Sequence, residues 1–239
     1  MNPAESAVVA KGQVAVLGLG RFGQRVARDL QLKGVDVLAI DRDPNRVRES
    51  SALLQHVMVA DVSDRAALIE LGVPESESVI VAVGGDIQVS LLTTVLLKTL
   101  GATDVVARAR DELHGNALRQ LGADRVVFPE LDTAERLAHS LSFKGVQDYF
   151  ELGRDYGIST VLVNDGMAGK TIEELGLVHP RQANELSVVL IIRNRNEAVI
   201  HPDRFEKVSG GDVLVLAGLD KEFEALHFER FESNGGDGR

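Results

Sequence analysis

Short apolar runs alternate with amphipathic stretches along the first half of the chain. The runs Val14–Leu17 and Val79–Val83 contain no polar residue, which is typical of strands buried on both faces of a parallel sheet. The pattern predicts six strands: Gln13–Leu17, Val35–Ile40, His56–Ala60, Ser78–Val83, Asp104–Ala109 and Arg125–Phe128. Five helices are predicted between them: Arg21–Lys33, Pro44–Leu54, Asp64–Leu71, Asp86–Leu100 and Asp111–Leu121. This alternation predicts the α/β class, with a doubly wound parallel Rossmann-like sheet.

A sixth helix is predicted over Asp132–Phe143, after the sheet is complete. Asp132 and Glu135 have the spacing of a capping box. An apolar stripe at helical spacing follows, made of Ala134, Leu137, Ala138 and Leu141. The stripe can pack on another subunit, on a second domain or back on the same sheet, and the sequence leaves these alternatives open.

The rest of the chain predicts a smaller α+β domain. The pattern is interrupted around Gly145–Gly157, and charged or Asn-rich turns at Asn194–Glu197 favour an antiparallel sheet. The expected elements are the strand Ser159–Val163, the helix Lys170–Leu175, the strands Ser187–Arg193, Ala198–His201 and Asp212–Ala217, and the closing helix Lys221–Glu229. We therefore expect a first domain at 11–131, a crossover helix and linker at 132–148, a second domain at 149–230 and a disordered polar tail at 231–239.

Composition narrows the class of protein. The 239 residues carry a formal net charge of −10, with more acidic than basic residues in both halves, which argues against binding to nucleic acid. With no cysteine, disulfides and thiolate metal sites are excluded. The longest uncharged stretches are about half the ~20 residues that a membrane helix needs, and no cleavable leader precedes the first strand. A soluble cytoplasmic protein is expected.

The residues from Gly18 to Gly23 read GLGRFG, directly after the first predicted strand and at the start of the first helix. Gly18 permits the tight turn, Gly20 lets a phosphate approach the backbone, and Gly23 lets the helix pack close to the strand. The N–H groups and positive dipole end of that helix can then bind an anion. A glycine-rich turn without a ligand is the alternative, but the strand–turn–helix context favours a nucleotide site.

Asp41 ends the second predicted strand, 21 residues beyond Gly20. A carboxylate there can accept both hydroxyls of an adenosine ribose and would repel a 2′-phosphate. Arg42 offsets part of that repulsion, so NADP is disfavoured rather than excluded. The alternative role for Asp41 is the N-cap of the next helix, a position that Asp43 fits at least as well.

Other strand ends are expected at the same crevice, because doubly wound sheets bind ligands outside the carboxyl ends of their strands. Gly84 and Gly85 close the fourth strand, where bare backbone leaves room for a ligand. Asp61 closes the third strand, where an adenine edge can be read. Arg108 lies near the end of the fifth strand, and Glu130 lies just beyond the sixth.

Arg21 is unusual for a dinucleotide site, where the position after the second glycine is often small or apolar. A guanidinium there adds a full charge and bidentate donors, and together with Arg108 it would suit a third phosphate. The alternative is a solvated arginine in the first turn, which the helix dipole disfavours. The charge placement therefore favours a phosphate contact.

These residues resemble a known family. GLGRFG, the strand end Ala39–Asp41, VAVGGDIQVSLLTTVLLK (Val81–Lys98) and LGADRVVFPE (Leu121–Glu130) resemble the cytoplasmic regulatory subunits of Ktr/Trk-type potassium uptake systems. These subunits contain the domain that regulates potassium conductance, known as RCK. The resemblance covers nearly the whole chain, with specific motifs in the first half and a match of pattern and length in Tyr149–Phe228.

The resemblance implies a homodimer that assembles into an octameric ring beneath a membrane-embedded potassium-translocating subunit. It implies ATP or ADP as the ligand in the Ktr branch and NAD(H) in the Trk branch, which usually carries two tandem copies of this unit. The single copy and Arg21, which matches a γ-phosphate contact, favour the Ktr branch. Matching also places Asp41 at the ribose and Arg108 at a phosphate, and counts Phe22 among the nucleotide-binding residues.

Two further ligands are implied by the resemblance. Glu130 would help to place a divalent cation near the triphosphate, and a carboxylate beside phosphate oxygens suits Mg²⁺ or Ca²⁺. Some family members bind cyclic di-AMP at the dimer interface of the second domain. The segment His179–Asn184 departs from that pattern, so no residue is assigned to this ligand.

The sequence thus predicts a nucleotide-sensing regulator of potassium uptake without catalytic turnover. It would lie in the cytoplasm, held at the membrane by its channel partner. An NAD(H)-sensing regulator of the Trk type is one alternative. A small NAD-dependent oxidoreductase is another, although the scattered histidines His114, His139, His179 and His201 offer no obvious general acid.

Overall fold

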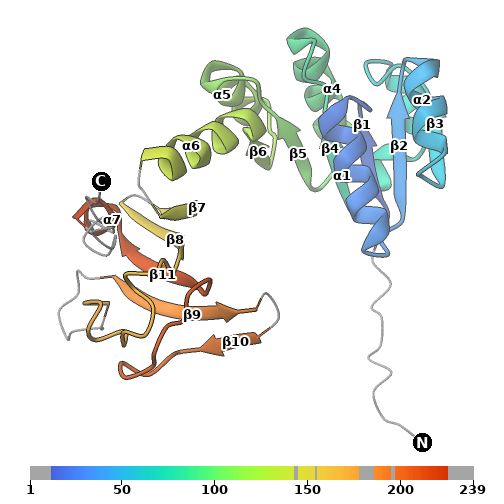
Figure 1. The fold of residues 1–239 in the computed structure, drawn as a ribbon. Helices are drawn as coiled ribbons and strands as arrows, with labels where there is room; N and C mark the ends of the chain where they lie inside the picture. Colours follow the sequence, from blue (N-terminus) through green and yellow to red (C-terminus); the bar gives the residue numbers. More distant parts are fainter. Residues whose placement is uncertain (1–11, 143–144, 154, 178–185, 195–196, 226–239) are drawn as a thin grey trace, which may run out of the picture. The chain divides into compact units, whose positions relative to one another are not determined.

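The computed structural model describes residues 12–142, 145–153, 155–177, 186–194 and 197–225 (Figure 1). Its contacts divide the chain into two compact units, residues 1–131 and 132–239. No helix among the described residues is long and apolar enough to cross a membrane.

The first unit is built on a six-stranded parallel sheet in the order β3-β2-β1-β4-β5-β6. The strands are β1 Val14–Leu17, β2 Val37–Asp41, β3 His56–Val59, β4 Ser78–Val81, β5 Val105–Arg108 and β6 Arg125–Val127. The helices are α1 Arg21–Leu32, α2 Pro44–Ser51, α3 Arg65–Glu70, α4 Ile87–Thr99 and α5 Glu112–Gln120, with a short 3₁₀ turn at Val73–Glu75. The strand order confirms the predicted fold class.

Apolar residues cover both faces of this sheet. Side chains alternate along β1, so that Ala15 and Leu17 join one buried cluster and Val16 joins another. Leu97 of α4 and Leu118 of α5 belong to the first cluster. The second cluster contains residues of α1 and α2, namely Ala27 and Val47. Burial on both faces explains why the strands are nearly continuous apolar runs.

The helix starts of this unit differ in how their first N–H groups are capped. Asp43, Asp64, Asp86 and Asp111 cap α2, α3, α4 and α5, each with a carboxylate that accepts a backbone N–H of the first turn. Helix α1 has Gly20 at its N-cap and no side chain that accepts from its first turn among the described residues. The N–H groups at the start of α1 are therefore open to an external acceptor.

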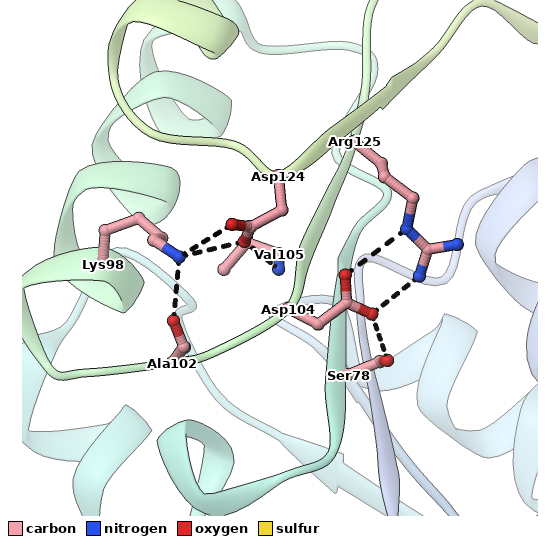
Figure 2. Close-up of polar contacts among 7 residues, drawn as sticks. All are labelled: Ser78, Lys98, Ala102, Asp104, Val105, Asp124 and Arg125. Carbon is pink, nitrogen blue, oxygen red and sulfur yellow. Dashed lines mark hydrogen bonds and ion pairs between the residues drawn. The ribbon is translucent and has the colours of Figure 1, made fainter.

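Polar contacts tie strands β4, β5 and β6 together at their N-terminal ends, away from the loop at Gly18–Gly23 (Figure 2). Asp104 accepts hydrogen bonds from Ser78 and from Arg125, with 3.3 Å between Arg125 Nε and Asp104 Oδ1. Asp124 accepts from Lys98 Nζ at 2.9 Å and from the Val105 N–H at 2.7 Å. These bonds hold the pKa of both carboxyl groups below their ordinary values, chiefly through Arg125 for Asp104 and the Val105 N–H for Asp124.

Helix α6 spans Pro129–Ser142 and begins three residues earlier than expected. Asp132 therefore lies inside the helix, so the predicted capping box of Asp132 and Glu135 is wrong. None of its residues is buried, and Leu137 and Leu141 are 57% and 78% exposed. Arg136 of α6 forms an ion pair with Asp148, with 3.1 Å between Nε and Oδ1, and its guanidinium lies 4.2 Å from the Phe150 ring centroid.

The second unit contains an antiparallel sheet in the order β10-β9-β11-β8-β7. Its strands are β7 Val146–Gly153, β8 Tyr156–Leu162, β9 Ser187–Arg193, β10 Glu197–Ile200 and β11 Val213–Leu219, followed by helix α7 Asp220–Ala225. The sheet confirms the expected α+β class for this part of the chain.

Two predicted features of this unit are wrong. The expected interruption around Gly145–Gly157 is the β7–β8 hairpin, in which Tyr149 packs on Gly157 where a Cβ would overlap its ring. Residues 170–175 do not form the expected helix. Thr171 and Glu174 satisfy each other's backbone N–H groups, as at a helix start, but turns follow, and Thr171 pairs with Lys207 in an isolated β-bridge. The segment 179–184 and the tail 231–239 lie outside the described residues.

Candidate functional site

The loop between β1 and α1 has the geometry that its glycines predict. Gly18 has a φ of +100° and donates its N–H to the Ile40 carbonyl oxygen at 2.7 Å. A Cβ at Gly23 would overlap the Gly18 carbonyl oxygen, so α1 approaches the loop more closely than any larger residue permits. At Gly20, by contrast, no atom lies within 4 Å of where a Cβ would stand. The loop is therefore tight at both ends and open in the middle, beside the uncapped start of α1.

Asp41 fixes this loop to the end of β2. Its Oδ2 accepts the Leu19 N–H at 2.6 Å, and its Oδ1 accepts the Asp43 N–H at 2.8 Å. Only 5% of the residue is exposed. The N-cap of α2 is Asp43, so Asp41 does not take that alternative role. Oδ2 also accepts from Arg46 Nη1, whereas Oδ1 has one described donor and keeps capacity for a second.

Arg46 is a member of this cluster that sequence reasoning missed. Its Nη1 lies 3.5 Å from Asp41 Oδ2, and its Nε lies 3.7 Å from Asp43 Oδ2. The sequence held a usable signal, because Arg46 stands in the first turn of α2, three residues beyond the carboxylate that caps it. The positive charge of Arg46 offsets the negative charges of Asp41 and Asp43.

A second group of predicted residues meets around the guanidinium of Arg108, at the end of β5. A Cβ at Gly84 would overlap Arg108 Nη1, so the guanidinium lies directly on the bare backbone after β4. The Phe22 ring centroid is 5.6 Å from Arg108 Cζ, in a cation–π arrangement. Nη2 forms an ion pair with the Glu130 carboxylate in the first turn of α6. The structure thus brings together Phe22, Gly84, Arg108 and Glu130.

The remaining predicted residues are not part of either cluster. Arg21 is exposed as the first residue of α1, and no described contact joins it to Arg108. Asp61 is exposed after β3 and accepts from Ser63, which lowers the pKa of its carboxyl group. The charge of Arg42 lowers the same pKa further, which places Arg42 near Asp61. Asp61 therefore starts a turn before α3, in the manner of an Asx turn.

The protein groups that the structure describes do not by themselves make a metal site. Among the described residues, no group of three or more His, Asp or Glu side chains is placed to hold a metal ion. Glu130 is engaged by Arg108, although 61% of its side chain is exposed. A cation here would need phosphate oxygens among its ligands, as hard divalent ions accept in nucleotide complexes.

Comparison with known proteins identifies the family. The family model of the TrkA-N domain matches residues 14–129. The Ktr system potassium uptake protein C of Bacillus subtilis is 35% identical over 208 residues, which cover 87% of this chain and 92% of that protein. The Ktr system potassium uptake protein A of the same organism is 33% identical over 223 residues, covering 93% of this chain and 96% of that protein.

The chain belongs to the Ktr/Trk family of regulatory subunits. Two solved GsuK structures share the fold of this chain. The GsuK RCK domain superposes with a TM-score of 0.64 at 21% identity, covering 92% of this chain and 48% of that one. The GsuK channel bound to NAD gives 0.65 at 21% identity, covering 92% of this chain and 39% of that one. This Ktr/Trk chain therefore spans about half or less of the GsuK chains that it matches.

Proposed function

We propose that this chain is a nucleotide-sensing regulatory subunit that gates a membrane potassium-uptake channel or transporter, without catalytic turnover. The uncapped N-terminus of α1, beside open space at Gly20, carries this proposal in a chain of the Ktr/Trk family. Four neighbouring helices use a carboxylate at that position, and such a carboxylate would repel a phosphate. A glycine leaves the N–H groups and the dipole for an anion.

The ligand that we propose is ATP or ADP. The diphosphate would lie on the backbone of Gly18, Gly20 and Gly23, and the ribose hydroxyls would donate to Asp41. Arg21 and Arg108 would contact the later phosphates. NAD(H) is the alternative ligand, because a solved RCK protein of similar fold, the GsuK channel, is bound to NAD.

Four other residues complete the proposed pocket. Asp61 and Arg42 would border the adenine side of the crevice, where the two charges offset each other. Phe22 and Gly84 would line the phosphate side, beside Arg108. We propose Glu130 as the protein ligand of an Mg²⁺ or Ca²⁺ ion, whose charge would offset that of the triphosphate.

Gating would follow from unequal affinity for two conformations. A ligand shifts a conformational equilibrium only by binding one state more tightly than the other. ATP and ADP differ by one charged phosphoryl group, so cationic side chains at the helix mouth can distinguish them. The chain would act in the cytoplasm as a homodimer within an octameric ring, bound to an integral membrane subunit. Cyclic di-AMP is a candidate second ligand of the C-terminal unit.

Calorimetry on the purified full-length chain tests the nucleotide. ATP and ADP should bind and should displace NADH in competition, which distinguishes this reading from the NAD(H)-sensing alternative. Arg21→Ala should weaken ATP binding about tenfold and ADP binding less, because the lost guanidinium makes a charge-assisted contact with the third phosphate. The control is Arg28→Ala, an exposed arginine further along α1. Equal losses for ATP and ADP would contradict the role of Arg21.

An NAD-dependent oxidoreductase is the competing function, supported by the same loop and by Asp41. His114 does not suit a general acid, because it is 3% exposed and its burial lowers the pKa of its imidazole. Any change of nicotinamide absorbance with a small substrate would favour the enzyme over the regulator.

A further inference from the structure

Arg108 has more hydrogen-bonding capacity than its protein contacts use. Its side chain is 19% exposed and lies between the Gly84 backbone and the Phe22 ring, both in the proposed nucleotide pocket. Its Nε is buried and has no hydrogen-bond acceptor among the described residues. A buried donor without a partner is costly, so an acceptor at this position would stabilise the site.

Glu130 occupies one of the two N–H groups through which Arg108 would bind a phosphate most strongly. A guanidinium binds phosphate best through two parallel N–H groups, and the edge that includes the free Nε also includes Nη2. Nη2 forms the ion pair with Glu130 Oε1. A phosphate on this edge would share Nη2 with a carboxylate and would place two negative groups at one cation. Phosphate and Glu130 cannot both bind Arg108 in full.

Glu130 is also the second residue of helix α6. A carboxylate in the first turn of a helix is stabilised by the exposed N–H groups there, so Glu130 has a favourable position when Arg108 leaves it. Further along the same helix, Arg136 binds Asp148 of β7 within the second unit.

We propose that Glu130 competes with the nucleotide's phosphate for Arg108. It thereby sets how strongly the site prefers highly charged nucleotides. This inference rests on the proposed nucleotide-sensing function and adds a specificity-determining residue to it. The more negative the phosphate chain, the more completely Arg108 turns from Glu130.

Binding of ATP, ADP and AMP to the full-length chain in a buffer with EDTA tests the competition. Glu130→Gln should tighten ATP binding about three- to tenfold, since the amide no longer holds the guanidinium. ADP should gain less, and AMP should not change. Because the Glu130 side chain is 61% exposed, the substitution should leave the fold intact. Glu135→Gln, which removes a charge from the same helix at a residue with no described contact to Arg108, should change none of the three affinities.

A double substitution identifies the intermediary. In an Arg108→Ala background, Glu130→Gln should have no effect on ATP affinity, because the guanidinium for which Glu130 and the phosphate compete is absent. An unchanged or weaker ATP affinity in Glu130→Gln would overturn the proposal, and so would an equal gain for AMP or the same gain in the Arg108→Ala background. If no form of the protein binds an adenine nucleotide, the proposed function itself fails, which is a distinguishable result.

Discussion

Two glycines of the loop between β1 and α1 differ in their surroundings. A methyl group at Gly23 would overlap the Gly18 carbonyl oxygen, whereas a methyl group at Gly20 would meet no atom within 4 Å. Gly20 also has φ −67° and ψ −179°, which alanine adopts without strain. Gly23 is therefore needed for packing, whereas the described packing around Gly20 leaves room for a side chain. We propose that Gly20 serves the nucleotide that approaches the loop from outside.

Alanine at these two positions should separate folding from binding. Gly23→Ala should lower the free energy of unfolding by about 3 kcal/mol, through overpacking of the loop against α1. Gly20→Ala should lower it by no more than about 1 kcal/mol, the usual cost of losing a glycine N-cap. Gly20→Ala should nevertheless weaken ATP binding about tenfold or more, because the methyl group keeps phosphate from the N–H groups. Urea unfolding and calorimetry measure the two effects.

The two variants would contradict this view if they behaved alike. Similar losses of stability would mean that Gly20 is also packed, and unchanged ATP affinity in Gly20→Ala would place the phosphates elsewhere.

At this scale the sequence predicted local geometry well and side-chain partners poorly. The spacing from Gly18 to Gly23 predicted the loop because the close approach of Gly23 to the Gly18 carbonyl oxygen lies within the motif itself. The ion pair of Arg108 with Glu130 joins residues 22 positions apart and depends on two side-chain rotamers. The sequence could place both residues at the same edge of the sheet, but it could not predict that they bind each other.

Among the elements, β4, β5 and β6 depend on charged contacts at their N-terminal ends. Arg125, the first residue of β6, binds Asp104, which precedes β5, and Asp104 also accepts from Ser78, the first residue of β4 (Figure 2). The fold lowers the pKa of Asp104 from its ordinary value of 3.8, so it favours the ionised form. The ionised Asp104 carboxylate therefore stabilises the folded protein above pH 3.8. This stabilisation is lost as the pH falls through the lowered pKa that Asp104 has in the folded state.

Asp104→Asn should therefore destabilise the protein in a pH-dependent way. At pH 7 the loss should be about 1 kcal/mol, the usual contribution of such a bond. The difference from wild type should shrink below about pH 4, as the wild-type carboxylate protonates. Urea unfolding at a series of pH values checks this, with exposed Glu49→Gln on α2 as the control. A difference that stays constant down to the acid unfolding transition would contradict the contribution of the ionised carboxylate.

Elements with a strong apolar pattern were predicted, and elements with a mixed pattern were not. The buried strands of the first sheet stand out because both of their faces are apolar. β7 reads VQDYFELG and was missed, since Phe150 and Leu152 are exposed and glycines flank it on both sides. The turn at 170–175 has a helix-start signal in Thr171 and Glu174, but no apolar stripe follows to continue the helix.

At the scale of the whole molecule, α6 presents apolar side chains that are exposed among the described residues. Leu137 and Leu141 stand on one side of the helix with Ala134 and Ala138, which are also exposed. Because exposed apolar stripes are often surfaces for another protein chain, we propose this one as a subunit contact. A second copy of the chain is the partner expected for a homodimer.

The combined substitution Leu137→Glu and Leu141→Glu should lower the native mass from the multimer to a smaller species. Both leucines are already exposed, so the folded fraction measured by circular dichroism should not change. Leu113→Glu is the matched control, since this leucine of α5 is 82% exposed and lies outside α6. A multimer that survives the double substitution would show that subunits associate through a different surface.

The order of strands in the first sheet has a consequence for synthesis on the ribosome. β1 lies inside the sheet; β2 and β3 follow on one side of it, and β4, β5 and β6 then follow on the other. Each new strand therefore pairs with an edge that already exists, and none has to be inserted between two strands that are already paired. The sheet can grow outward in step with translation, and it is complete before the second unit emerges.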